Sequence, residues 1–486
     1  MAPDPASISP ISISPLLKQL VAHAPVIEKE IDAARLLIYD ERLSLAQKSL
    51  FFALLKARGH DLNELEYRLL EQCIEDTPPD GYYISIASVL RKLLDPGNME
   101  DGQATADEIA DAVGIIFENR LVVAQCSLLL GLLAYTCQDR DPVVLAKVAE
   151  EMMAAAEHVE TGALHAATSK VQRSKGRYEG GLCDIVGTGG DGHSTFNVST
   201  TASIIASSSL LISKHGNRAS SSTSGSADLL QSIPPEAPDI EAVTSQTLPF
   251  IYENSSYAFL FAPIFHPGMR HVATIRKNLG IRTIFNVIGP LANPVGGAIE
   301  ARVVGVAEKS MGRVYAEALR LSGARKALVV CGAENLDEIS CAGKTYCWHL
   351  FEDKENIRLE QFELEPADFG LPAHPLSDVA GGKLPHENAN FLVSLLKNKL
   401  TPDDPILHFV LMNTAALFAT SGICEDDEGQ ERNGFAKADE VITERGPGGQ
   451  RWKEGIRLAR KAIESGAALE SLDRFIEATR RCSDTQ

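Results

Sequence analysis

The feature that most constrains this chain is a glycine-rich turn between a short apolar run and a polar, helix-compatible stretch. The apolar run Leu182–Val186 predicts a buried strand, and Gly187–Gly192 follows it with four glycines in six positions. Glycine reaches positive φ angles and leaves backbone N–H groups open to a closely approaching ligand. The small polar residues Thr195, Asn197, Ser199 and Thr200 come next, before a helix predicted at Thr201–Ser208. This order of strand, glycine loop and hydroxyl-rich helix start is typical of a site for an anionic phosphate.

The glycine turn alone also fits a bare structural turn. It lacks the Gly-Lys-Ser/Thr end of a Walker loop and the ordered glycines of the dinucleotide fingerprint. A second stretch favours the functional interpretation, because the apolar run Leu210–Ile212 leads into Lys214–Arg218 and a serine-rich turn at Ser220–Asp228. Two hydroxyl-rich turns with two cations between them predict a site for a polyphosphate.

Composition limits the classes of protein that this chain can be. Its 486 residues predict two or three domains, and 44% hydrophobic with 6% aromatic residues is typical of a globular α/β enzyme. The formal net charge of −19 argues against a nucleic-acid surface. Nine cysteines without a Cys-x-x-Cys pair predict reduced thiols. The absence of a signal-like start and of an apolar run near ~20 residues predicts a cytoplasmic protein without a membrane partner.

The first third of the chain is predicted to be helical and contains an internal repeat. Within residues 14–160, short motifs recur at a constant offset of 78 positions, among them Glu30-Ile31 with Glu108-Ile109 and Ala46-Gln47 with Ala124-Gln125. Each copy is then a small group of amphipathic helices that must bury its apolar face. Chance similarity of two leucine-rich helices is the alternative, and the gap-free register argues against it.

From Leu182 onward the pattern predicts an α/β fold with a mostly parallel sheet. Strands are expected at Leu210–Ser213, Tyr257–Phe261, Ala301–Val306 and Lys326–Cys331, followed by an antiparallel pair at Trp348–Phe351 and Asn356–Leu364. The stretch Glu425–Gln450 is predicted to be a polar, flexible loop, and Trp452–Ile463 an amphipathic helix.

Two further groups of residues can carry chemistry. Asp337 and Glu338 follow a predicted strand end, where adjacent carboxylates repel each other unless a cation such as Mg²⁺ lies between them. A solvated acidic turn is the alternative. Farther upstream, His266 before a proline is more typical of a turn than of a catalyst, whereas the guanidinium of Arg276 suits a carboxylate ligand. The apolar stretch Gly280–Pro294 is interpreted as packing beside a pocket.

Taken in order, these motifs resemble the anthranilate phosphoribosyltransferase family, from about Ser88 to Phe475. The resemblance implies a fold in which an all-helical N-terminal domain packs on a mostly parallel α/β domain, here preceded by an extra helical repeat. The expected ranges are 1–80 for the extra repeat, 81–175 for the helical domain and 176–486 for the α/β domain. Parts of 262–295 are expected to pack with the helical domain. Ser220 and Gly268 depart from the usual family pattern without changing the kind of any implied ligand contact.

The resemblance also implies an activity, in which anthranilate reacts with phosphoribosyl pyrophosphate and releases pyrophosphate in tryptophan biosynthesis. Lys214, His215 and Arg276 are the implied catalytic residues, although His215 as a proton acceptor is an open choice. The implied phosphoribosyl pyrophosphate site comprises Gly187, Gly190, Asp191, Thr195, Asn197, Val198, Ser199, Thr200, Lys214, Ser222 and Ser226. The implied anthranilate site comprises Gly187, His215, Asn217, His266 and Arg276, and Mg²⁺ is assigned to Ser199, Asp337 and Glu338.

The remaining expectations concern binding partners and alternative functions of the protein. A homodimer through the helical domain is expected, with no nucleic-acid partner. A pyrimidine nucleoside phosphorylase would share the architecture, but a Mg²⁺-pyrophosphate site is idle in a phosphorolysis enzyme. A non-catalytic nucleic-acid-binding relative is a second alternative, and the acidic net charge speaks against it.

Overall fold

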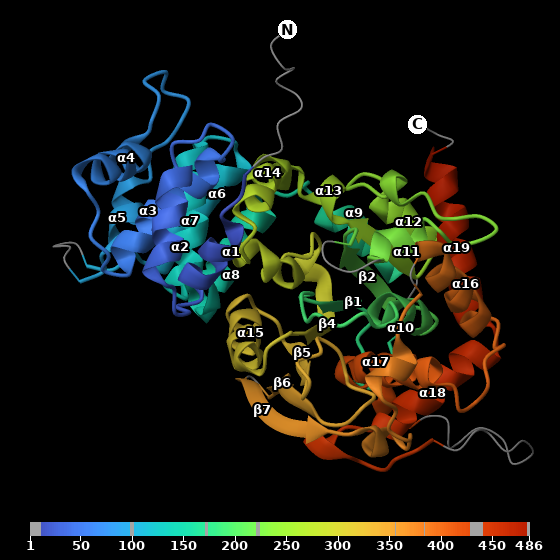
Figure 1. The fold of residues 1–486 in the computed structure, drawn as a ribbon. Helices are drawn as coiled ribbons and strands as arrows, with labels where there is room; N and C mark the ends of the chain where they lie inside the picture. The colour runs from blue at the N-terminus through green and yellow to red at the C-terminus, as the bar shows by residue number, and fades with distance from the viewer. Residues whose placement is uncertain are drawn as a thin grey trace, which may run out of the picture. The chain divides into compact units, whose positions relative to one another are not determined.

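The computed structural model describes residues 11–97, 102–170, 174–219, 224–354, 356–382, 384–427 and 441–483. It divides into two compact units, drawn in Figure 1. The helical unit contains Met1–Ala156 and His266–Gly289, and the sheet unit contains Glu157–Phe265 and Pro290–Gln486. The implied phosphate and metal residues belong to the sheet unit, whereas His266 and Arg276 belong to the helical unit.

The helical unit is built from the repeat and from one returning segment. Its helices are α1 (Ser14–Val21), α2 (Glu28–Leu37), α3 (Leu45–Ala57), α4 (Glu64–Glu75), α5 (Ala87–Leu94), α6 (Ala106–Phe117), α7 (Val123–Tyr135), α8 (Pro142–Ala154) and α14 (Arg270–Leu279). The repeat is visible in these bounds, because α2, α3 and α4 begin 78 positions before α6, α7 and α8. The two copies therefore fold into corresponding helices.

The central helices of the two copies pack against each other. Gly131 on α7 lies so close to Leu50 on α3 that a side chain at this glycine would overlap the leucine methyl groups. Leu50, Leu54 and Leu55 are fully buried, as expected for apolar faces that need a partner. Helix α14 contacts both α3 and α7, so both copies support this returning helix.

The sheet unit contains one seven-stranded sheet in the order β3-β2-β1-β4-β5-β6-β7. Its strands are β1 (Leu182–Gly187), β2 (Leu211–Gly216), β3 (Tyr257–Phe261), β4 (Ile299–Gly305), β5 (Lys326–Gly332), β6 (Thr345–Asp353) and β7 (Asn356–Leu364). The first five are parallel, and β6 and β7 are antiparallel. The predicted sheet class and the antiparallel pair are confirmed. Because the carboxyl ends of parallel strands meet at one edge, the loops after β1, β2 and β5 converge there.

Helices cover this sheet, with α15 on one side and α10, α17 and α18 on the other in Figure 1. They are α9 (Thr161–Ser169), α10 (Val198–Ala206), α11 (Ser226–Leu230), α12 (Leu248–Asn254), α13 (Ala262–Phe265), α15 (Lys309–Leu321), α16 (Pro385–Leu396), α17 (Pro405–Ser421), α18 (Trp452–Glu464) and α19 (Ala467–Ser483). Helix α17 is buried along almost its whole length, which makes it the central helix of this core. Among the described residues, no helix is long and apolar enough to cross a membrane.

Several predicted boundaries are wrong by a few residues, as for β4 and β6, and two of them lie beside the implied site. Helix α10 begins at Val198 rather than at Thr201, since the backbone N–H of Thr201 already donates to the carbonyl of Asn197 at 3.2 Å. Strand β2 extends to Gly216, because its pairing with β3 continues to Phe261. Both extensions place polar residues inside regular structure, where their backbone positions are fixed.

The polar stretch predicted at 425–450 is described only at its ends, and 428–440 lie outside the described residues. Arg445 forms an ion pair with Glu425 at 2.6 Å, and Arg451 forms one with Asp427 at 2.6 Å. These ion pairs join the two ends of the stretch to each other.

Candidate active site

The glycine loop after β1 lies directly against the loop after β5. Gly189, Gly190 and Gly192 have φ angles of 69°, 76° and 79°, which other residues rarely adopt. The N–H of Gly189 donates to Oδ2 of Asp337 at 2.6 Å. A side chain at Gly187 would overlap the carboxylate of Asp337, and one at Gly305 would overlap its carbonyl oxygen. Glycines at the ends of β1 and β4 therefore let the acidic loop approach the glycine loop.

Three carboxylates gather at this edge of the sheet. Surrounding protein atoms dehydrate Asp337, and the charge of Asp191 lies nearby, so burial first and repulsion second raise the pKa of Asp337 to about 7. Burial and the charges of the same two aspartates raise the pKa of Glu338 well above its usual range. Such crowding of like charges disfavours ionisation unless a cation is present.

The donor set of these residues suits Mg²⁺. Among the described residues, no group of three or more His, Cys, Asp or Glu side chains forms a metal site by itself. Mg²⁺ needs no such group, because it takes one or two carboxylates together with phosphate oxygens and water. Asp337 and Glu338 could provide the carboxylates, and burial first and neighbouring negative charges second raise their pKa values.

A hydroxyl group beside the implied metal residues bonds to one of these carboxylates. Thr195 Oγ1 donates to Oε2 of Glu338 at 3.4 Å. Ser199 is partly exposed in the first turn of α10 and makes no hydrogen bond to either carboxylate within the described chain. A role for Ser199 in metal binding therefore stays a prediction.

The two hydroxyl-rich turns meet, as the sequence predicts. Asn197 Nδ2 donates to the carbonyl of Ser224 at 2.8 Å, and Thr200 Oγ1 donates to Oγ of Ser226 at 2.8 Å. These bonds join the start of α10 to the start of α11. Val198 is buried as the first residue of α10, and Ser222 and Ser220 lie outside the described residues.

The cationic segment after β2 begins inside the sheet. Lys214 is buried, and its Nζ donates to the carbonyl of Ile185 at 2.7 Å. Burial lowers the pKa of Lys214, and the negative charges of Asp184 and Glu338 oppose that shift. His215 is also buried, near the carboxyl end of β2. Asn217 follows the strand, and its Oδ1 accepts the N–H of Arg218 at 2.7 Å.

The two implied residues of the helical unit belong to its returning segment His266–Gly289. His266 is buried and precedes the short 3-10 turn Pro267–Met269, so its position before a proline is a turn position, as the residue type favours. Arg276 is in the last turn of α14, partly exposed, with its guanidinium 5.7 Å from the ring centre of Phe285. Burial lowers the pKa of Arg276, and no carboxylate within the described chain forms an ion pair with it.

Sequence reasoning misses a buried polar cluster beneath the glycine loop. Asp184 on β1 accepts a hydrogen bond from Nδ2 of Asn293 at 2.9 Å, and Arg302 is its register partner on β4. The available signal was an aspartate and an arginine inside two otherwise apolar strands. The pairing itself is beyond sequence reasoning, since 109 residues separate Asp184 from Asn293.

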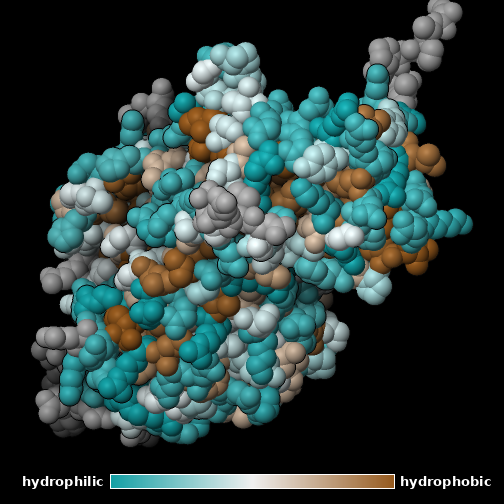
Figure 2. Space-filling view, turned by 90° about the vertical axis from the view of Figure 1, so that its left-hand side faces the viewer, coloured by the Kyte–Doolittle hydropathy of each residue, from teal (hydrophilic) through white to brown (hydrophobic). Residues whose placement is uncertain are grey.

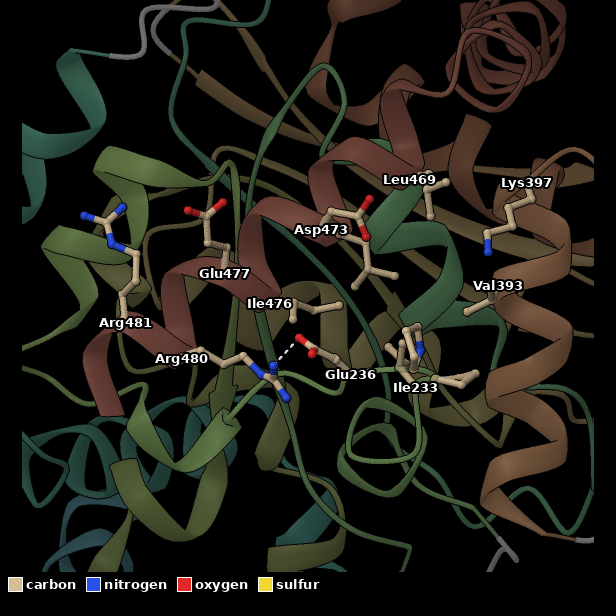
Figure 3. A pocket seen from close by; sticks show the side chains of 13 residues that line it. Ile233, Glu236, Val393, Lys397, Leu469, Asp473, Ile476, Glu477, Arg480 and Arg481 are labelled. Carbon is tan, nitrogen blue, oxygen red and sulfur yellow. Dashed lines mark hydrogen bonds and ion pairs between the residues drawn. The ribbon is translucent and has the colours of Figure 1, made fainter. Parts of the chain in front are cut away.

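A cavity of about 430 Å³ lies elsewhere in the sheet unit, between α16, α19 and the turn at Ile233–Glu236 (Figure 3). Its floor is apolar and its rim carries both signs of charge, with Arg480 paired to Glu236. None of the implied site residues lines this cavity.

Comparison with known proteins agrees with the motif order. Residues 179–469 match the family described as Glycosyl transferase family, a/b domain. An anthranilate phosphoribosyltransferase of Schizosaccharomyces pombe is 46% identical over 293 residues, covering 60% of this chain and 73% of the relative. The enzyme of Saccharomyces cerevisiae is 41% identical over 303 residues, covering 61% and 72%.

Solved structures give the same result. Anthranilate phosphoribosyltransferase from Saccharomyces cerevisiae in complex with PRPP and Mg superposes with a TM-score of 0.66 and 34% identity, covering 82% of this chain and 98% of that one. The enzyme from Thermus thermophilus superposes with a TM-score of 0.62 and 31% identity, covering 81% and 99%. Almost all of each solved chain is therefore matched, whereas about a fifth of this chain has no counterpart there.

Proposed function

The chain belongs to the anthranilate phosphoribosyltransferase family, and from this premise we propose which of its residues perform each part of the reaction. The reaction transfers the 5-phosphoribosyl group from phosphoribosyl pyrophosphate to the amine of anthranilate and releases pyrophosphate. The single observation that carries the proposal is the meeting of the glycine loop with Asp337 at the carboxyl edge of the parallel sheet.

The phosphates of phosphoribosyl pyrophosphate bind to the glycine loop and the start of α10. The glycines of this loop carry no side chains that would keep a phosphate away from the backbone, and the helix start adds a favourable dipole. Hydroxyl and amide groups of Thr195, Asn197, Thr200 and Ser226 supply neutral donors. Gly187, Gly190, Asp191, Val198, Ser199 and Ser222 complete the proposed site.

Asp337 and Glu338 hold Mg²⁺ in this proposal, with Ser199 or Thr195 as the neighbouring hydroxyl. When bound, Mg²⁺ neutralises negative charge on the pyrophosphate. A solved yeast relative was obtained with PRPP and Mg. The raised pKa values of Asp337 and Glu338 support the assignment, since a divalent cation relieves the repulsion between them.

Anthranilate is held through its carboxylate by Arg276. A guanidinium forms bidentate hydrogen bonds to carboxylates. Arg276 is partly dehydrated, and its guanidinium lies over the ring of Phe285. Asn217, His215, His266 and Gly187 complete the proposed acceptor site. A yeast relative was solved with 4-fluoroanthranilate.

The chemical step is a displacement without a covalent enzyme intermediate. As pyrophosphate departs, the ribose carbon gains positive character, and Lys214 with the glycine-loop N–H groups stabilises the negative charge of the leaving group. The amine of anthranilate attacks this carbon and then loses a proton, for which His215 is a candidate acceptor. Alignment of the two bound substrates supplies most of the acceleration.

The helical unit is the proposed site of homodimer formation. Nine large apolar side chains are exposed on its described part: Ile27, Leu36, Tyr39, Leu45, Leu65, Tyr67, Tyr82, Val123 and Val143. Only Leu321 and Leu384 are exposed in this way in the described sheet unit. Figure 2 shows separate hydrophobic patches on a largely hydrophilic surface.

All nine cysteines are free thiols, which supports the proposal of a cytoplasmic location.

The direct test is an assay of anthranilate fluorescence with phosphoribosyl pyrophosphate and Mg²⁺. The proposal predicts that fluorescence falls only when both substrates and the metal are present. Phosphorolysis of a pyrimidine nucleoside with orthophosphate, without loss of anthranilate, would favour the phosphorylase alternative.

A further inference from the structure

Three charged side chains, one anion and two cations, are buried in adjacent strands that lead to the edge with the glycine loop. Asp184 on β1, Lys214 on β2 and Arg302 on β4 are 2%, 1% and 7% exposed. Asp184 and Arg302 are register partners in adjacent strands, and β2 borders β1 on the other side. Buried charges destabilise a fold unless opposite charges compensate them. Here one carboxylate lies among two cations, and Glu338 adds a second negative charge that acts on Lys214.

The two carboxylate oxygens of Asp184 differ in their hydrogen bonding. Its Oδ2 accepts the hydrogen bond from Nδ2 of Asn293, which also donates to the carbonyl of Ser213 on β2 at 2.9 Å. Its Oδ1 is buried and accepts no hydrogen bond from the described residues. Asn293 therefore fixes the carboxylate across two strands, while the charge remains available to neighbouring cations.

Lys214 depends on this charge. Its Nζ donates to the carbonyl of Ile185, the residue after Asp184, so the ammonium group lies against the same strand. Of the two anions that oppose the lowering of the pKa of Lys214 by burial, Asp184 contributes more than Glu338. In the opposite direction, burial raises the pKa of Asp184, and Lys214 is the largest influence that lowers it.

The other titratable groups that surround Asp184 do not replace it as a counter-charge. Arg302 is a further cation, and burial lowers its pKa while Asp184 opposes the shift. Tyr252 and Tyr257 are buried phenols whose pKa values burial raises, so both are neutral at physiological pH. Cys183, beside Asp184 on β1, is a buried thiol whose pKa burial raises, and it is neutral as well.

We infer that Asp184 is a positioning residue of the active site, whose buried carboxylate keeps Lys214 charged and directed toward phosphoribosyl pyrophosphate. This inference rests on the proposed role of Lys214. Asp184 itself lies beneath the loop within β1, and it acts on the substrate through the lysine.

The experiment is a double-mutant cycle with Asp184→Asn, Lys214→Met and the two combined, measured as kcat/KM for phosphoribosyl pyrophosphate. Asp184→Asn is expected to lower kcat/KM by about tenfold or more, because an uncompensated buried cation loses its proton readily. In the Lys214→Met background the same change is expected to add less than about twofold. Equal losses in both backgrounds would overturn the inference.

The pH profile separates an electrostatic role from a structural one. Removing the counter-charge lowers the pKa of Lys214, so the basic limb of the kcat/KM profile is expected to move to lower pH in Asp184→Asn. Asn293→Ala is the comparison variant, because it removes one hydrogen bond to the carboxylate and leaves Asp184 itself in place. That variant is expected to melt at a lower temperature with the basic limb near its wild-type position. An unmoved limb in Asp184→Asn, or the same movement in Asn293→Ala, would contradict the inference.

Thermal melts keep the test decisive even when Asp184→Asn folds poorly. Removing both charges restores the balance, so the double variant is expected to melt above Asp184→Asn. A double variant that melts no higher than Asp184→Asn would contradict the pairing. If Lys214→Met keeps the wild-type kcat/KM, the proposed role of Lys214 itself is overturned. If Lys214→Met loses most of its kcat/KM and Asp184→Asn lowers kcat/KM equally in both backgrounds, only the positioning role of Asp184 is overturned.

Discussion

The carboxyl edge of the sheet and the helical repeat differ in how they treat polar side chains. At the edge, Asp337 and Glu338 crowd together, and their pKa values rise because the charged forms are disfavoured. In the repeat, the corresponding amides Gln47 and Gln125 are buried and satisfied. Gln47 accepts the N–H of Ile13 at 2.9 Å, and Gln125 donates to the carbonyl of Ile74 at 2.7 Å.

This difference separates residues kept for ligand binding from residues kept for folding. Crowded like charges weaken a fold and are useful only when a ligand compensates them. A satisfied buried amide stabilises a fold and offers nothing to a ligand. Changes at the sheet edge should therefore reduce activity without reducing stability, and changes in the repeat should do the reverse.

The largest expected effect is that of Asp337→Ala combined with Glu338→Ala. Loss of charge stabilisation on the leaving group should lower kcat by about 10³-fold or more. The melting temperature should stay the same or rise, because repelling carboxylates are removed. Steady-state kinetics and a thermal melt check both points, with Glu360→Ala on the exposed part of β7 as the control. A variant that is inactive because it is unfolded would contradict the comparison.

The next effect is that of removing residues 1–80, the first copy of the repeat. The change uncovers the surface around Gly131 that Leu50 now covers. Each of Leu50, Leu54 and Leu55 stabilises the fold by roughly 1.5–3 kcal/mol through burial. The shortened chain should melt at a much lower temperature or aggregate. A shortened chain that melts like the full one would show that the first copy is not part of the core.

Arg276→Ala tests whether the helical unit also holds a ligand-binding residue. Loss of a charge-assisted pair costs about 1.5–3 kcal/mol, so KM for anthranilate should rise about 10- to 100-fold while phosphoribosyl pyrophosphate is little affected. Arg276→Lys should rescue poorly, because lysine lacks the planar fork. Lys277→Ala, an exposed neighbour on α14, is the matched control. Equal weakening of both substrates would assign Arg276 a structural role.

Gln125→Ala should affect stability rather than turnover. It leaves the N–H of Ile86 and the carbonyl of Ile74 without their partner, at a cost of about 1–3 kcal/mol. Gln47→Ala is its counterpart, and it also releases the carbonyl of Asn278 at the end of α14. Chemical denaturation and kcat are the measurements. A fall in kcat with unchanged stability in Gln125→Ala would break the proposed separation.

The smallest effect concerns a polar pair that occurs in the first copy alone. Arg35 and Glu66 form an ion pair at 3.0 Å, and the second copy has buried Val113 and Val144 at the corresponding positions. Replacing a buried ion pair by apolar residues is often neutral or stabilising. Arg35→Val with Glu66→Val should therefore change the free energy of unfolding by less than about 1 kcal/mol. Arg35→Val alone should be worse, because Glu66 then stays buried without its cation.

The parts of the molecule that could be predicted from the sequence are those that depend on residues close together in the chain. The glycine loop, the acidic pair at Asp337 and Glu338 and the 78-residue repeat each follow from local pattern, and the mostly parallel sheet follows from the alternation of strands with helices. Helix α10 begins three residues earlier than predicted, because polar residues such as Ser199 fit either a turn or a first helical turn. Contacts that tertiary structure alone creates stayed hidden, as between Asp184 and Asn293.

The central claim is that the carboxylates at the sheet edge bind phosphoribosyl pyrophosphate through Mg²⁺. The most direct measurement is the calorimetric affinity for phosphoribosyl pyrophosphate at increasing Mg²⁺, in the wild-type chain and in Asp337→Ala/Glu338→Ala. Because Mg²⁺ binds the free substrate equally in both titrations, the difference between them isolates the protein carboxylates. The account predicts that wild-type affinity rises about tenfold or more with Mg²⁺, a gain of about 1.4 kcal/mol, and that this gain disappears in the double variant. The same gain in both chains would contradict the account.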